Sequence, residues 1–468
     1  RMGQPSSSAV GDRISVAALL RAGPVAALAL LFAALAGVPP AALWAQAGAF
    51  MGVASCSGST CHGRAEGNGA VVRQDEIAAW QDPSSPTGAH SRAWAVLLGA
   101  RGRAIAATLG LGNPAAAPAC LGCHATTPGG SGQGAKFLTS DGVSCETCHG
   151  AAGGWLAVHY TRAASHASNV AAGMTPLERP QVRANVCLDC HWGSATGNQF
   201  VTHAMMAAGH PRLSFELDLF SALQQHHAED ADYIRRKGRT DSIRQWAVGQ
   251  AEAVRRQTDL FARPDYGSRG LFPELTFFDC HSCHRQITDG PQRRLTFGTN
   301  PGRPIRFGNP PFNDENMILL SAVARSLAPG EAARFDAASR AFHAAFADGR
   351  GGAQQAALDL RDRAASLSSA LAARSFPATD AFEVIATVAG EATRPRFTDY
   401  AGSVQAVMAV DTLLNALVRE GRVTVGAAAG IRASINRAYA AVEAPEGYRP
   451  AAFRAALGQA ARAVGSLQ

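Results

Sequence analysis

The hydrophobic positions of this chain follow two different patterns. From residue 314 to the end, alanine, leucine and valine recur at spacings of three and four, which is the pattern of amphipathic helices that bury one face. This pattern predicts helices over residues 314–327, 331–347, 353–374, 379–390, 398–419, 424–443 and 450–466. Asn313 and Thr398 stand where helix N-caps are expected, and Pro or Gly residues stand at the breaks. Residues 314–468 are therefore predicted to form a helical bundle.

Residues 48–296 show no such periodicity. They contain loop signals such as GGSGQG (129–134) and AAGG (151–154), and predict only one long helix, near residues 240–263. Large apolar runs are few, although burial of apolar surface is the main force that drives folding. Something other than side chains is expected to fill this interior. The Gly/Pro-rich segment 297–313 is predicted to link this loop-rich domain of short helices to the bundle.

The first 47 residues have the pattern of a targeting segment. Arg13 and Arg21 precede the apolar run VAALALLFAALAGV (25–38), and small residues follow at Ala45 and Ala47. The run is shorter than the roughly 20 residues that span a bilayer. We expect residues 1–47 to be a cleaved signal peptide, with a retained N-terminal anchor as the alternative. Either predicts a periplasmic or other extracytoplasmic location.

All ten cysteines belong to five motifs that end in histidine. Four motifs read C-x-x-C-H: Cys120, Cys123 and His124; Cys145, Cys148 and His149; Cys187, Cys190 and His191; Cys280, Cys283 and His284. The first motif in the chain, CSGSTCH, has four residues between Cys56 and Cys61 before His62. C-x-x-C-H attaches c-type haem through two thiols, and its histidine ligates the iron. Gly58 and its small neighbours allow the longer first motif to bulge. Five c-type haems are therefore predicted.

Zinc and disulfides are the alternatives for these cysteines. Paired cysteines form four-cysteine zinc sites, and exported proteins commonly form disulfides. Neither explains why a histidine follows the second cysteine five times, so haem attachment is preferred.

Nine further histidines could supply the second iron ligand. The preferred candidates are His90, His159, His203, His210 and one of His226 and His227, with His226 favoured. His203 and His210 are seven residues apart, which places them on one helical face from which they could serve two neighbouring haems. His166 is a weaker candidate, and His281 and His343 are expected to be ordinary residues. Two histidines on every iron favour electron transfer over chemistry at an open iron.

Bound haem also changes the charge of the protein. The formal net charge of +7 falls to +5 once residues 1–47 are removed. The propionates of five haems would add about ten negative charges, and bound groups belong in any electrostatic argument. The basic composition is therefore poor support for a nucleic-acid partner, and none is expected.

Two stretches resemble a known family. DGVSCETCHG followed by His159, together with HAMMAAGHPRLSFEL, is similar to exported multihaem c-type cytochromes, in the family that includes the tetrahaem electron carrier of nitrification. The resemblance covers residues 51–290. It implies that a histidine some way after one motif reaches across to a different haem, a role that falls on His159 and His90. The fifth motif, the stretched first motif and the appended bundle depart from the tetrahaem pattern.

These observations predict a mainly α protein that relays electrons through five covalently bound, mostly bis-histidine haems. Its expected partners are redox proteins, among them a membrane-bound electron-transfer complex. The alternative is a multihaem oxidoreductase in which one open haem acts on a small nitrogen compound; such an enzyme needs acid or base groups beside the open iron. A third hypothesis makes the bundle a docking module for a membrane complex.

Overall fold

The computed structural model describes residues 48–468 apart from 69–71, 197–198, 227–228, 268–273, 285–302, 306–308 and 395–399. The predicted signal peptide and most of the predicted linker lie outside the described residues. Within them the protein is mainly α, as predicted, and the β contacts are two isolated bridges, Phe50 with Gln133 and Phe278 with Phe312.

The helices of the cysteine-containing half are mostly short. They are α3 (Glu76–Gln81), α4 (Ala100–Thr108), α5 (Pro118–His124), α6 (Cys145–His149), α7 (His166–Ala171), α8 (Pro180–His191), α9 (His203–Ala207), α10 (Leu217–Leu223), α11 (Ala231–Lys237), α12 (Ser242–Ala262), α13 (Pro264–Gly267) and α14 (Cys280–Cys283). Only α12 is long, as the sequence predicts, and 3₁₀ turns and loops connect the others.

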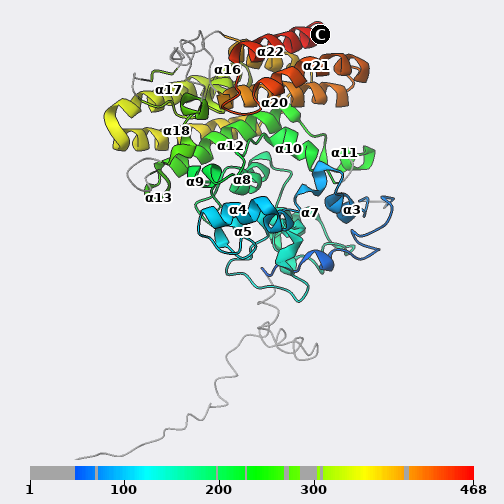
Figure 1. The fold of residues 1–468 in the computed structure, drawn as a ribbon. Coiled ribbons are helices and arrows are strands. Elements are labelled where there is room, and N and C mark those ends of the chain that lie inside the picture. The colour runs from blue at the N-terminus through cyan, green and yellow to red at the C-terminus, as the bar shows by residue number, and fades with distance from the viewer. Residues whose placement is uncertain are drawn as a thin grey trace, which may run out of the picture.

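The second half is a bundle of seven helices among the described residues. They are α16 (Met317–Leu327), α17 (Pro329–Ala345), α18 (Gly349–Ala372), α19 (Asp380–Ala392), α20 (Tyr400–Arg419), α21 (Val425–Ala441) and α22 (Pro450–Gly465). Each matches one predicted helix within a few residues. Figure 1 shows these helices, yellow to red, as one layer above the cysteine-containing half.

Two predicted helix starts are wrong. Asn313 does not cap the first helix, because α16 begins at Met317 and the Asp314 carboxylate accepts the Ile318 N–H at 2.9 Å. The second predicted start, residue 353, falls late: Gly349, with φ +82°, does separate the 3₁₀ turn Phe346–Asp348 from the next helix, but Gly351 and Gly352 already lie in the first turn of α18. The predicted cap at Thr398 lies outside the described residues.

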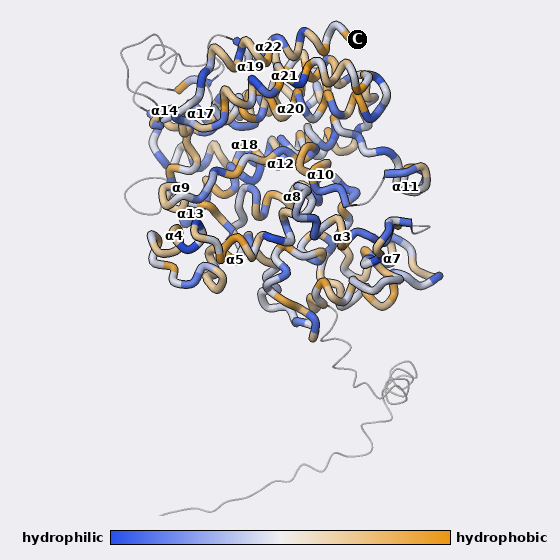
Figure 2. The backbone as a smooth tube through the Cα atoms, turned by 45° about the vertical axis from the view of Figure 1, so that its right-hand side comes forward, coloured by the Kyte–Doolittle hydropathy of each residue, from blue (hydrophilic) through white to orange (hydrophobic). Residues whose placement is uncertain are grey.

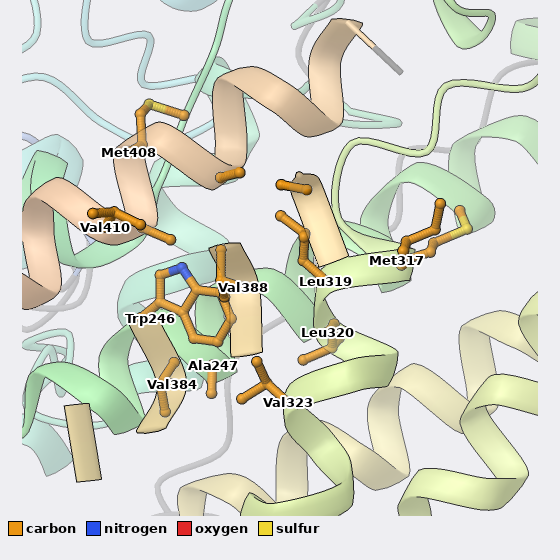
Figure 3. Close-up of a cluster of buried hydrophobic side chains, with 14 of the residues drawn as sticks. Trp246, Ala247, Met317, Leu319, Leu320, Val323, Val384, Val388, Met408 and Val410 are labelled. Atoms are coloured by element: carbon orange, nitrogen blue, oxygen red, sulfur yellow. The ribbon is translucent and has the colours of Figure 1, made fainter. Parts of the chain in front are cut away.

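Helix α12 lies between the two layers (Figure 1) and packs against α18, α16 and α20 of the bundle as well as α8 and α10 of the other half. Its Trp246 is fully buried. Figure 3 shows the indole beside Val384 and Val388 of α19 and near Val323 of α16. One hydrophobic core therefore extends across the predicted linker, from Ile243 to Val464.

The two halves differ in how they are filled. Along the bundle helices, apolar and polar positions alternate (Figure 2), and the apolar ones join the core around α12. In the other half, a second buried cluster contains only Ala184, Leu188, Phe215, Leu217 and Ala253. Side chains thus supply little of this interior, in line with the sequence pattern.

Within the described residues, α20 is the one helix long and apolar enough to cross a membrane by length and composition. In its most apolar window 83% of the residues are buried inside the structure. Here α20 is a core helix of the bundle, where Leu413, Leu414 and Leu417 are fully buried.

Candidate haem sites

The four regular motifs lie on short helices. Helices α5, α6 and α8 end at the motif histidine, and α14 ends at Cys283, one residue before it. Residues three apart lie on the same side of a helical turn, so both thiols of a motif can reach one flat group. All ten cysteines are free thiols. We number the sites first to fifth in the chain order of their motifs.

The stretched first motif forms a turn in place of a helix. The Cys61 N–H donates to the Gly58 carbonyl at 2.8 Å, and the His62 N–H donates to the Cys56 carbonyl at 3.1 Å. The extra residues are taken up between the two cysteines, so His62 returns to Cys56. A Cβ on Gly58 would lie 3.2 Å from the Cys61 sulfur, so a larger residue would crowd the thiol.

Each motif histidine faces one of the predicted distal histidines. The ring centroids are 6.4 Å apart for His62 and His159, 6.3 Å for His124 and His210, 6.2 Å for His149 and His226, 6.3 Å for His191 and His90, and 6.1 Å for His284 and His203. The five partners come from segments far from the motifs they face. His159 and His90 both reach a motif other than the nearest one, as the resemblance implies.

The spacing of these pairs is that of two imidazoles on one metal. Imidazole bonds to a metal at about 2 Å, and a ring nitrogen lies ~1.2 Å from the ring centroid, so two rings on opposite sides of one atom have centroids ~6.3 Å apart. Aromatic pairs without a metal have centroids about 4.5–7 Å apart, so the inference rests on every motif histidine having such a partner as well as on the distance. All five pairs have the centroid spacing expected for one metal atom between the two rings.

Hydrogen bonds orient the rings for this arrangement. In four histidines the Nδ1 atom lies within hydrogen-bond distance of a backbone carbonyl oxygen. The pairs are His124 with Ala93 and His159 with Leu156, both at 2.7 Å, and His210 with Pro211 and His226 with Gln224, both at 2.8 Å. His62 Nδ1 is 3.0 Å from the Glu76 carboxylate. A carbonyl accepts the Nδ1 proton and thereby fixes the tautomer, which leaves Nε2 for a metal.

Burial keeps the innermost pair neutral. Burial, followed by the neighbouring His90, lowers the pKa of His191 to about 4. Burial also lowers the pKa of His90. A neutral imidazole has the lone pair that a metal ligand needs.

Four of the five pairs line one large cavity of about 2660 Å³. Ordinary small-molecule pockets measure about 300–1,000 Å³, so this space suits several large groups. Val72, Val96, Tyr160 and Leu223 also line it, and all four are large apolar side chains left exposed by the protein alone. Flat apolar groups in the cavity would cover them. The fifth pair, His284 and His203, is not among the lining residues.

The donors fit haem better than zinc. In the described part of the chain, no group of three or more His, Cys, Asp or Glu side chains comes together to hold a metal. Each site offers two imidazoles beside two thiols that a porphyrin would occupy. Haem brings the four in-plane nitrogens itself.

Contacts between attachment segments give the order of the sites. The Gly52 N–H, four residues before Cys56, donates to the carboxylate of Glu146 in the third motif at 2.8 Å, which makes the first and third sites neighbours. Helix α6, which carries the third motif, packs against α8, which carries the fourth. The Cys123 thiol lies 3.9 Å from the Cys190 carbonyl oxygen and links the second to the fourth.

The segment around α9 extends this order to the fifth site. It carries His203, which faces the fifth motif, and His210, which faces the second. Contacts thus connect the first site to the third, the third to the fourth and the fourth to the second, and the α9 segment connects the second to the fifth, which gives the order first, third, fourth, second, fifth.

The other described histidines have different partners. His166 lies 3.0 Å from the Glu178 carboxylate, His281 Nδ1 is 2.8 Å from the Pro445 carbonyl oxygen, and His343 is 3.3 Å from Asp314. The weaker expectation for His166 and the ordinary roles expected of His281 and His343 stay predictions. His227 lies outside the described residues.

Sequence reasoning missed the charged residues beside the sites. Glu76 contacts His62, Glu446 lies 3.6 Å from His284 Nδ1, and Arg212 contacts Cys280. Arg212 lies two residues after the candidate ligand His210, and this closeness in sequence is a weak indication that Arg212 lies near a site. Nothing in the sequence marks Glu76 or Glu446, because both contacts depend on the tertiary fold.

Fold and sites together have the features of a c-type cytochrome. Residues 56–150 match the family described as cytochrome c554 and c-prime. This segment holds the first three motifs and His90, and its similarity supports c-type haem iron in this chain. Neither a curated protein nor a solved structure matches the chain.

Proposed function

We propose that this protein is an extracytoplasmic electron carrier with five covalently attached haems, each held between two histidines. One observation carries the proposal: five motif histidines face five other histidines at 6.1–6.4 Å, the spacing of two imidazoles on one iron. Haem, when bound, supplies one-electron chemistry at its iron. The similarity over residues 56–150 agrees with such a carrier.

In this proposal the chain's own residues hold and insulate the cofactors. The two thiols of each motif would tether a haem, and the two paired imidazoles would ligate its iron. Because two imidazoles would hold each iron, the arrangement favours a carrier over an oxidoreductase that binds a small nitrogen compound at iron.

The order of the sites suggests a path for electron transfer through the protein. The ends of the order first, third, fourth, second, fifth are the first and fifth sites. Cys61 and Cys283 at these ends are exposed, whereas the eight other cysteines are partly buried. Redox partners would exchange electrons at the two ends, and a membrane-bound complex is the expected partner at one of them. The leader-like residues 1–47 support export.

Haem count and spin state test the proposal together. We expect the mature protein to weigh its amino acids plus five haems, and its oxidised spectrum to be wholly low-spin and unchanged by nitrite, hydroxylamine or nitric oxide. Mass spectrometry and low-temperature spin-state spectroscopy measure the two quantities. Fewer than five haems, or a high-spin signal that responds to these compounds, would contradict the five-haem carrier.

The angle between paired rings predicts distinct spectral classes. The ring planes are 12° apart in the first site but 89° and 90° apart in the second and third. Near-parallel imidazoles split the iron d orbitals that they contact, whereas perpendicular ones leave them nearly degenerate. We therefore expect electron paramagnetic resonance of the oxidised protein to show a rhombic low-spin class and a class with one large g value. A single uniform class would contradict the pairing.

A further inference from the structure

The fifth attachment helix is held by the second half of the chain. The Asp279 N–H donates to the Pro311 carbonyl at 2.9 Å, and the Asp279 side chain caps α14 by accepting the Ser282 N–H at 2.8 Å. His281, inside the motif itself, is buried and lies 2.8 Å from the Pro445 carbonyl oxygen, between α21 and α22. The bundle therefore forms one wall of the fifth site.

An ion pair lies directly against this site. Arg212 donates from one guanidinium nitrogen to the Cys280 sulfur at 3.3 Å and from another to the Glu315 carboxylate at 2.9 Å. The Arg212 side chain is 19% exposed and that of Glu315 only 5%. In the mature protein the Cys280 sulfur would be a thioether of the haem, so the pair would sit at the edge of the macrocycle.

The bundle fixes the acidic partner. The Asn313 side-chain amide donates to Glu315 at 3.2 Å, and the Gln405 amide of α20 donates to its other oxygen at 3.1 Å. Gln405 also donates to the Phe215 carbonyl at 2.9 Å, which ties this network to the haem-binding half. Both charges are thus held in place and partly out of water, where charges interact more strongly than at the surface.

We propose that the bundle is the second half of the fifth haem site and that the Arg212–Glu315 pair sets the reduction potential of that haem independently of the other four. The inference rests on the proposed five-haem function. The separation of the fifth pair from the large cavity supports it, since this haem would have its own surroundings. Arg212 and Glu315 act here as positioning residues, because neither ligates iron.

The two charges should act in opposite directions. Reduction adds one electron to the iron, so a fixed positive charge nearby stabilises the reduced state and a fixed negative charge opposes it. Arg212→Gln leaves the Glu315 charge alone beside the haem and is expected to lower one potential. Glu315→Gln leaves the Arg212 charge alone and is expected to raise it. The double variant should return close to the original value.

Spectroelectrochemical titration of the full holoprotein tests this, with the haem count measured on every sample. We expect one haem in five to shift, downward in R212Q and upward in E315Q, while R212K, which keeps the charge, stays near the wild type. The exposed ion pair of Arg334 and Glu331 in α17 is the matched control, and R334Q should shift none.

Two outcomes separate the failures. A wild-type protein with a number of haems other than five would contradict the proposed function. Five haems whose potentials do not shift in the variants would overturn this inference alone. The same holds if R212Q and E315Q shift the potential in the same direction. If the R212Q protein does not accumulate, the E315Q protein alone tests the inference. The inference is then overturned if the reduction potential of the fifth haem does not rise in E315Q.

Discussion

Produced without haem attachment, the full chain is expected to lose the fold of residues 48–241 while the helices around α12 remain folded. The reason is the division of the interior between side chains and cofactors. In the cysteine-containing half, a cavity of about 2660 Å³ stands where a core would be, beside a small apolar cluster around Leu188 and Phe215. Burial of apolar surface is the dominant favourable term in folding, and here much of it would have to come from the haems.

The bundle has its own source of stability. Trp246, Phe335, Phe342, Phe453 and Leu457 are fully buried among side chains, with no need of a cofactor. Its core is continuous from α12 to α22. We therefore expect two regions of unequal stability in the haem-free protein, because local opening depends on local burial.

Limited proteolysis followed by mass spectrometry of the fragments measures this difference. In the haem-free chain, sites within residues 48–241 should be cut at least about tenfold faster than in the holoprotein, which corresponds to a loss of ~1.4 kcal/mol in the free energy of opening. Sites within 317–465 serve as the internal control and should change little. Equal protection of residues 48–241 in both forms would mean that side chains alone hold this half together.

The helices of the bundle were predictable because the signal for each one, the spacing of its apolar residues, lies within the helix itself. A helix that buries one face has apolar residues at spacings of three and four. All seven described helices of the second half could therefore be located from the spacing of Ala, Leu and Val. The errors fall at helix ends. Asp314 is the residue that accepts the Ile318 N–H, and Asn313 resembles a cap equally well in the sequence. Gly349 does end the preceding turn, with φ +82°, whereas Gly351 and Gly352 lie inside α18 although glycine is a poor helix former.

The division into domains shows a second limit of sequence reasoning. A change in composition near residue 297 separates cysteine-rich from cysteine-free chain, and it predicts a linker there. Helix α12 precedes that point but buries Trp246 and Val248 in the core that the bundle helices share. Nothing in the amphipathic pattern of α12 tells which partner each of its faces will meet.

The residues of the candidate sites also fall into two groups, those predictable from the sequence and those that depend on the tertiary fold. The motif residues follow from spacing alone, because two thiols and an imidazole must reach one macrocycle. Five distal candidates could be chosen among the remaining histidines, but their pairing depends on how the chain crosses itself. His90 faces His191 although it lies nearest in sequence to the first and second motifs. The positions of the charged neighbours Glu76, Arg212 and Glu446 beside the sites result from tertiary contacts, which no periodic pattern in the sequence indicates.

Substitution of His90 is expected to interrupt the relay at its centre. The fourth site is the middle of the order first, third, fourth, second, fifth, and His90 is the residue that faces its motif histidine, with ring centroids 6.3 Å apart. His90→Ala would remove one of the two ligands proposed for that iron and leave the iron open to small molecules. An open haem iron becomes high-spin and binds small ligands.

We expect one haem in five of the H90A protein to become high-spin and to bind carbon monoxide when reduced, with the haem count unchanged at five. The changed ligation shifts the potential of the central haem. Electron transfer from a reductant at one end to an acceptor at the other should slow about tenfold or more, since each ~1.36 kcal/mol added to a barrier costs a factor of ten.

His166→Ala is the matched control for this substitution. His166 also lines the large cavity, but it pairs with Glu178 at 3.0 Å and faces no motif histidine in the described structure. H166A should therefore keep all five haems low-spin and inert to carbon monoxide. A high-spin haem in H166A, or a wholly low-spin H90A protein, would show that His90 is not the ligand of the fourth iron. Such a result would also break the centre of the proposed path, because the order of the sites and the pairing of the histidines come from the same fold.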